Sequence, residues 1–173
     1  LAFVGAETST GVRSDTEALC TIARNYNALT IVDAVTSLGG IELDVDGWGI
    51  DAIYSGSQKC LSCPPGISPV SFNEKAIKKI KARKKPVQSW FLDLNLVMGY
   101  WDSAGGRSYH HTAPVNALYA LHESLLILKE EGLKKAWVRH AEMSKMLGDG
   151  FKALGIKYLV EEKYRLPQLN TII

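Results

Sequence analysis

Short apolar runs alternate with helical patterns along the first half of the chain, and this alternation constrains the fold more than any other feature. The runs are apolar and partly β-branched, as in TIVDAV, and they cover residues 1–4, 30–35, 50–56 and 67–72. Apolar residues at helical spacing occupy residues 16–27, between the first two runs, and residues 74–82, after the last run, and we expect Asp15 and Asn73 to cap these two helices. Strands alternating with helices predict an α/β fold with a mainly parallel sheet.

The second half of the chain has a different pattern. An aromatic-rich run, VQSWFLDLNLVMGYW, precedes two helical patterns at residues 115–128 and 133–154, which Gly132 separates. Two further apolar runs, IKYLV and LNTII, predict strands at 156–160 and 169–173. We expect residues 1–132 to form part of a large domain and residues 133–173 to begin a small α+β domain. Because both ends resemble strands already under way, we expect a piece of a longer chain.

Composition excludes several classes of protein. The net charge of +2 is too small to indicate nucleic-acid binding, and no apolar run approaches the ~20 residues of a membrane-spanning helix. We therefore expect neither nucleic acid nor a membrane as a partner. Three cysteines are too few, and odd in number, for a disulfide framework. They favour a reducing compartment, and we expect the cytoplasm.

Reactive side chains follow three of the expected strands. Glu7 and Thr8 come after the first strand, Asp33 ends TIVD, and Lys59 lies in the turn YSGSQKCLSCPPG. Open α/β sheets bind ligands at the carboxyl ends of their strands. A pyridoxal cofactor requires a lysine amine for its Schiff base and a carboxylate opposite its ring nitrogen. Asp33 and Lys59 on separate strand ends match that requirement.

Three other motifs have ordinary structural explanations. The CLSC motif is a single CxxC pair, which cannot supply the four ligands of a structural zinc ion. His110 and His111 are adjacent, and neighbours on an extended segment point to opposite faces, so we expect no metal site. The basic run KAIKKIKARKK has isoleucines at helical spacing, which predicts an amphipathic surface helix.

The segments VDAVTSLGG, GIDAIYSGSQKCLSCPPG and YHHTAPVNALYALHESL resemble the class V aminotransferases, the group with alanine–glyoxylate and serine–pyruvate aminotransferases. The resemblance extends over essentially the whole chain. It implies the large domain of a fold type I transferase dependent on pyridoxal 5'-phosphate (PLP), followed by the start of the small domain. The implied activity is transfer of an amino group from alanine or serine to glyoxylate or pyruvate.

The resemblance also implies roles for individual residues. Lys59 matches the Schiff-base lysine, which moves a proton between the substrate carbon and the cofactor. Asp33 matches the carboxylate on the pyridine nitrogen, and Val35 matches the side chain packed against the ring. Thr8 matches a hydroxyl that contacts the cofactor, and Gln58 a polar contact near its phosphate.

A partner subunit is implied by the same resemblance. Tyr109 and Thr112, in YHHT, match the pair that reaches the phosphate of the neighbouring subunit's cofactor. We therefore expect a homodimer with shared active sites.

Three alternatives remain open. A ureidoglycine–glyoxylate aminotransferase differs in its amino donor. A class V lyase of the cysteine desulfurase kind requires a nucleophilic cysteine on a mobile loop, whereas Cys60 and Cys63 lie beside the lysine turn. A module that only binds cofactor or dimerises is the third, and bleaching of a yellow preparation by alanine would exclude it.

Overall fold

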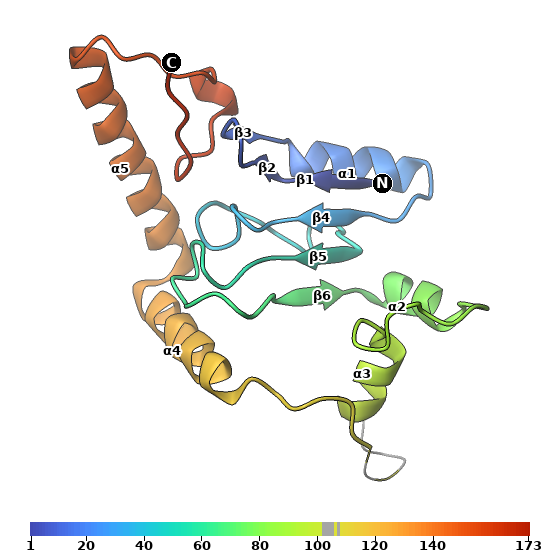
Figure 1. Ribbon diagram of the computed structural model, residues 1–173. Helices are drawn as coiled ribbons and strands as arrows, with labels where there is room; N and C mark the ends of the chain where they lie inside the picture. The colour runs from blue at the N-terminus through green and yellow to red at the C-terminus, as the bar shows by residue number, and fades with distance from the viewer. Residues whose placement is uncertain (102–105, 107) are drawn as a thin grey trace.

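The computed structural model describes residues 1–101, 106 and 108–173. Its main sheet has the strand order β1-β4-β5-β6 (Figure 1), with strands at Ala2–Val4, Ile31–Asp33, Ala52–Tyr54 and Val70–Phe72. β1, β4 and β5 are parallel, and β6 runs antiparallel at the edge. The predicted α/β fold with a mainly parallel sheet is confirmed.

The two faces of this sheet differ in burial. One face forms the core, in which β4 and β5 contribute Val32 and Ile53 beside Cys20, Ala34 and Ile50. The other face carries an in-register row across the four strands, formed by Val4, Asp33, Tyr54 and Val70. The apolar members of that row are 39% and 50% exposed, at Val4 and Val70. We call this side the open face of the sheet.

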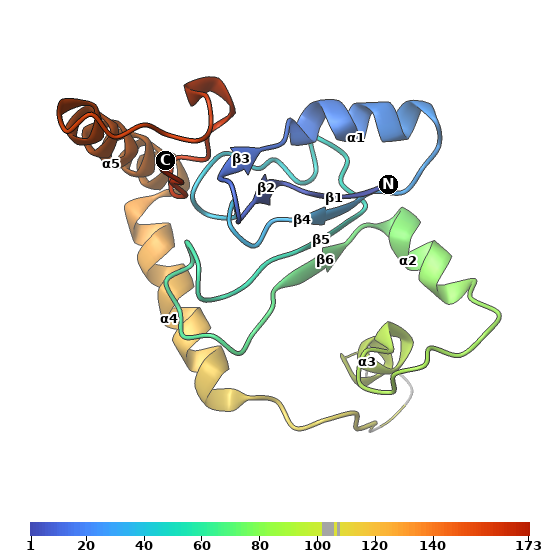
Figure 2. The same cartoon turned by 45° about the horizontal axis from the view of Figure 1, so that its top comes forward.

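Helix α1 (Thr16–Asn25) packs on the core face (Figure 2). Asp15 caps it as predicted, since its carboxylate accepts a hydrogen bond from the Ala18 N–H at 3.0 Å. Thr16, Cys20 and Ala23 follow helical spacing and are buried. A helix this short is not stable alone, so packing on the sheet is what maintains it.

A buried carboxylate connects the strands to helix α2 (Glu74–Lys81). Asp51 accepts hydrogen bonds from the Thr30 N–H at 2.8 Å and from the Asn73 amide at 2.9 Å. Asn73 is also the predicted cap of α2, because its side-chain oxygen accepts from the Ala76 N–H. Burial would raise the pKa of Asp51, but the hydrogen bonds from Asn73 and Thr30 and the charge of Lys75 hold it below its ordinary value.

Three more helices follow, α3 (Leu94–Trp101), α4 (Val115–Glu131) and α5 (Leu133–Ala153). Gly132 separates the last two, as predicted, with a φ of 87° that favours glycine. α4 and α5 lie beyond the carboxyl ends of β1, β4 and β5 (Figure 1). None of the described helices has the length and apolar character needed to span a membrane. The division into domains at Gly132 stays a prediction.

Two local predictions were wrong. Residues 156–160 and 169–173 are not strands in a sheet, and they meet in the isolated bridge Tyr158↔Ile172 around a short 3₁₀ helix (Glu162–Tyr164). Two short segments paired only across such a bridge have too few ladder hydrogen bonds for a regular sheet. The chain after β1 also contains the hairpin of β2 (Ala6–Glu7) and β3 (Val12–Arg13), whose strands are too short for a periodic pattern.

Candidate active site

The elements that carry Thr8, Asp33 and Lys59 end at the same edge of the sheet, as predicted (Figure 1). Asp33 is the last residue of β4, and Lys59 follows β5 after a turn at residues 55–58. Thr8 lies in the turn of the β2–β3 hairpin, which begins just after β1. Parallel strands bring these positions together because their carboxyl ends share one edge.

The Asp33 carboxylate is fixed by two hydrogen bonds. Its Oδ1 accepts from the Val35 N–H at 2.9 Å, and its Oδ2 accepts from the Tyr54 hydroxyl at 2.8 Å. The Asp33 carbonyl oxygen accepts from the Gly5 N–H at 2.8 Å, which ties the residue to the chain after β1. The result is a half-buried carboxylate held in one orientation on the open face of the sheet.

Tyr54 was not among the predicted site residues. It ends β5 directly beside Asp33 in the parallel register, so both side chains lie on the open face. The hydrogen bond to the Asp33 carboxylate, with some burial and the adjacent negative charge, raises the pKa of the Tyr54 hydroxyl. Aligning the last residues of IVD and AIY would have suggested this pair.

The turn that carries Lys59 is held by buried serine residues. Ser55 Oγ donates to the Ala34 carbonyl at 3.0 Å, and Ser57 Oγ donates to the Pro64 carbonyl at 2.8 Å. The Lys59 carbonyl accepts from the Ser62 N–H at 2.9 Å. The Ser57 hydroxyl is therefore directed inward, toward the Pro64 carbonyl. The side chains of Gln58 and Lys59 are exposed.

Thr8 is exposed in the hairpin turn. Its neighbour Glu7 shapes that turn by accepting hydrogen bonds from the Ser9 N–H at 2.9 Å and the Ser9 hydroxyl at 2.8 Å. Both hydrogen bonds lower the pKa of the Glu7 carboxyl, and the one from the Ser9 N–H has the larger effect. Thr8 therefore lies on an ordered turn, and the contact of its hydroxyl with a cofactor stays a prediction.

Tyr109 and Thr112 are brought together, but away from the other site residues. The Tyr109 hydroxyl lies 2.7 Å from Thr112 Oγ1, and both residues are exposed. They belong to the segment between α3 and α4, which both ribbon views place apart from the carboxyl ends of β4 and β5 (Figures 1 and 2). Within one chain this pair does not join the group formed around Asp33.

His110 and His111 lie between Tyr109 and Thr112, and the expected opposite orientation of their side chains is wrong. His110 and His111 do not point to opposite faces, since their Nδ1 atoms lie 2.6 Å apart. His110 is 3% exposed, stacks on Trp90 with ring centroids 4.1 Å apart, and places Nε2 2.9 Å from the Trp90 carbonyl oxygen. The segment is not a regular strand there, so alternation does not apply. The pair anchors the backbone on which Tyr109 and Thr112 lie.

The cysteines beside the lysine turn have a packing role. Cys63 is 5% exposed, and Cys60 is half-buried with Sγ 3.8 Å from the Thr36 carbonyl oxygen. Burial raises the pKa of the Cys60 thiol. A thiol that resists ionisation is a poor nucleophile.

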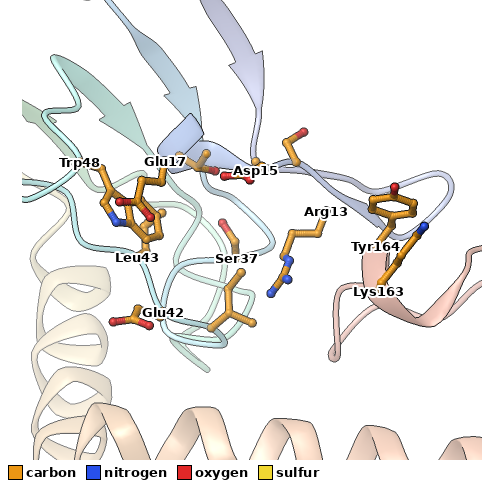
Figure 3. A pocket seen from close by; sticks show the side chains of 13 residues that line it. Arg13, Asp15, Glu17, Ser37, Glu42, Leu43, Trp48, Lys163 and Tyr164 are labelled. Atoms are coloured by element: carbon orange, nitrogen blue, oxygen red, sulfur yellow. The ribbon is translucent and has the colours of Figure 1, made fainter. Parts of the chain in front are cut away.

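A cavity of about 450 Å³ lies beside β3, the start of α1 and the loop that follows β4 (Figure 3). Arg13, Asp15 and Ser37 line it from the first half of the chain, and Lys163 and Tyr164 from the end. Neither Asp33 nor Lys59 is among the described residues that line it. The candidate active site is therefore the open edge at the strand ends, and not this cavity.

Comparison with known proteins assigns the chain to a family. The model of the aminotransferase class-V family matches residues 1–172. The alanine–glyoxylate aminotransferase of Oryctolagus cuniculus is 43% identical over 169 residues, which cover 96% of this chain and 43% of that protein. The (S)-ureidoglycine–glyoxylate transaminase of Bacillus subtilis is 36% identical over 190 residues, with 99% of this chain and 45% of that protein covered.

A solved structure is similar as well. The crystal structure of alanine–glyoxylate aminotransferase from Nostoc sp. matches 99% of this chain and 45% of its own, with a TM-score of 0.95 and 45% identity. The chain thus spans less than half the length of the relatives that it matches.

Proposed function

We propose, from the premise that this chain belongs to the class V aminotransferase family, that the protein is a PLP-dependent transaminase. It moves an amino group from alanine or serine to glyoxylate or pyruvate. The observation that carries the proposal is the placement of Asp33 at the end of β4 and of Lys59 in the turn that follows the neighbouring parallel strand β5. The relatives named alanine–glyoxylate aminotransferase support the choice of substrates.

The residues at this edge fit PLP. Asp33 presents a fixed carboxylate to the open face of the sheet, with lone pairs left to accept a hydrogen bond from a protonated ring nitrogen. Lys59 presents an exposed amine on the next strand end, and Val35, Thr8 and Gln58 would contact the ring and its substituents. When bound, PLP supplies an electron sink for the bond that breaks at the substrate's α-carbon.

Lys59 has two tasks in this proposal. Its Nζ would hold the cofactor covalently before substrate binds, and the substrate's amino group would free the amine. The freed amine then removes the proton from the α-carbon, which requires an uncharged nitrogen within hydrogen-bond reach. The ordered turn fixes the Lys59 backbone while leaving the side chain exposed, which suits a group that must move between these tasks.

Asp33 has one task, which is electrostatic. Its negative charge stabilises positive charge on the ring nitrogen, and a group held in place before the reaction needs no reorganisation during it. Its two intramolecular hydrogen bonds provide that preorganisation.

A ureidoglycine–glyoxylate aminotransferase is the second candidate, because a relative with that activity in its name is 36% identical. The cysteine desulfurase alternative is less favoured, because Cys63 is buried and burial raises the pKa of Cys60. We also propose a homodimer in which Tyr109 and Thr112 serve the partner's site. A reducing location, the cytoplasm, stays a prediction from the cysteine content.

The test is an assay of the full-length protein. Alanine with glyoxylate should yield pyruvate and glycine in the presence of PLP, and ureidoglycine should be a poor donor. Faster turnover with ureidoglycine would favour the second candidate. Absence of transamination with either donor would contradict the proposed function.

A further inference from the structure

We propose that Tyr54 is a positioning residue, whose hydroxyl holds the Asp33 carboxylate in the orientation that meets the ring nitrogen of bound PLP. The inference deepens the proposed function and rests on it.

The sheet itself sets the contact between these two side chains. Asp33 and Tyr54 are paired in the β4–β5 register, and the Ala34 N–H donates to the Tyr54 carbonyl at 2.9 Å. Their side chains therefore leave the sheet together on the open face, where the hydroxyl reaches Asp33 Oδ2 at 2.8 Å. A slip of one residue would reverse the direction of either side chain, so the contact is as fixed as the ladder.

Two donors act on two different oxygens of one carboxylate. The Val35 N–H binds Oδ1 at 2.9 Å, and the Tyr54 hydroxyl binds Oδ2. The last torsion of an aspartate is intrinsically broad, and rotation about it would break both bonds. With Tyr54 removed, one donor remains and the carboxylate can turn. Each oxygen keeps a further lone pair, so the arrangement does not use up its capacity to accept.

The ionisation of Tyr54 agrees with this role. The Asp33 hydrogen bond, partial burial and the charge of Asp33 all raise the pKa of its hydroxyl above the ordinary value. The phenol therefore remains a donor at neutral pH. Loss of a hydrogen bond to a charged group weakens an interaction more than loss of a neutral one.

The test uses the full-length protein in four forms: wild type, Tyr54→Phe, Asp33→Asn, and the double variant. PLP affinity is measured by titrating the visible absorbance of the bound cofactor. Tyr54→Phe should weaken binding by about tenfold, and in the Asp33→Asn background it should change affinity little, because a residue that acts through Asp33 has no effect without it. Tyr26→Phe is the matched control, since Tyr26 is 83% exposed on the surface.

Several outcomes would overturn the inference. Wild-type affinity in Tyr54→Phe would do so, as would equal losses in both backgrounds, which would mean that Tyr54 acts independently of Asp33. Failure of the wild type to bind PLP would instead remove the proposed function, and the inference with it. If Tyr54→Phe does not fold, the tyrosine ring signals are followed against pH by NMR in the cofactor-free protein. Asp33→Asn should lower the pKa of Tyr54, and an unchanged pKa would overturn the inference.

Discussion

Lys59 and Asp33 are held by the chain in different ways, and the difference matches their proposed tasks. The Lys59 backbone is fixed by the Ser62 N–H while its side chain is exposed. The Asp33 side chain is itself fixed, by Val35 and Tyr54. A group that forms a covalent bond and then moves a proton needs freedom, whereas a group that stabilises charge acts best when preorganised.

Lys59→Arg should abolish transamination while retaining positive charge and the fold. The guanidinium stays protonated at neutral pH, so it can neither attack the aldehyde nor accept the α-proton. We expect the turnover rate with alanine and glyoxylate to fall by at least about a hundredfold. Circular dichroism serves as the control for folding. A variant that transaminates at the wild-type rate would contradict the role of Lys59.

Asp33→Asn should weaken PLP binding yet leave it detectable, and should slow α-proton removal by roughly a hundredfold. The amide is neutral, and its hydrogen bond to a cationic nitrogen is weaker than that of a carboxylate. Single-turnover absorbance with alanine, compared with loss of deuterium from the α-carbon, measures the step. Equal rates for aspartate and asparagine here would contradict the electrostatic role.

Sequence reasoning found the residues that stand at strand ends and missed those defined by pairing. Asp33 ends a predicted strand and Lys59 lies in the turn after the next one, so their placement at one edge follows from strand direction alone. Tyr54 counts as an ordinary strand residue until its register with β4 is known. The contact between His110 and His111 depends on local backbone irregularity, which no periodic pattern encodes.

At the scale of elements, the Asp51 network that joins β4, β5 and α2 provides a test of stability. Asp51→Asn removes the charge and leaves two amide groups facing one another at Asn73. The buried N–H of Thr30, which donates to the Asp51 carboxylate, also loses a charged acceptor. We expect the free energy of unfolding to fall by about 1–3 kcal/mol at pH 7, measured by urea denaturation.

The same variant has a pH signature. The pKa of Asp51 is lowered in the folded state, so its contribution to stability is present above the unfolded value of about 3.9 and is lost as the pH falls through the folded value. The stability difference between wild type and Asp51→Asn should therefore be constant near neutrality and narrow below about pH 4. Asp149→Asn is the control, because its exposed pair with Lys145 contributes less than about 1 kcal/mol. A difference that widens on acidification would contradict the account.

Helices were easier to predict than strands for a physical reason. Asp15, Asn73 and Gly132 mark helix ends by local hydrogen bonding or by backbone conformation, which short sequence signals capture. The segments at 156–160 and 169–173 have strand-like composition, but a strand also needs a neighbouring strand in register. Composition alone does not supply that partner.

At the scale of the whole molecule, the separation of Tyr109 and Thr112 from Asp33 is explained if they serve the partner subunit's site. Mixed dimers test this. A Lys59→Ala chain combined with a Thr112→Val chain should form one site with an intact lysine and intact phosphate contacts. PLP affinity of that site should approach wild type, because a ligand that spans both chains binds wherever its contacts are complete. Affinity equal to that of the Thr112→Val parent would show that the residue serves its own subunit.

The most direct test of the central claim is chemical mapping of the covalent lysine. The full-length protein is incubated with PLP, reduced with borohydride, digested and analysed by mass spectrometry, with Lys59→Arg as the control. We predict the phosphopyridoxyl mass on the peptide that contains Lys59 and its loss in the control. Stoichiometric modification of a different lysine, or none in a protein that binds PLP, would contradict the assignment of Lys59 as the covalent site.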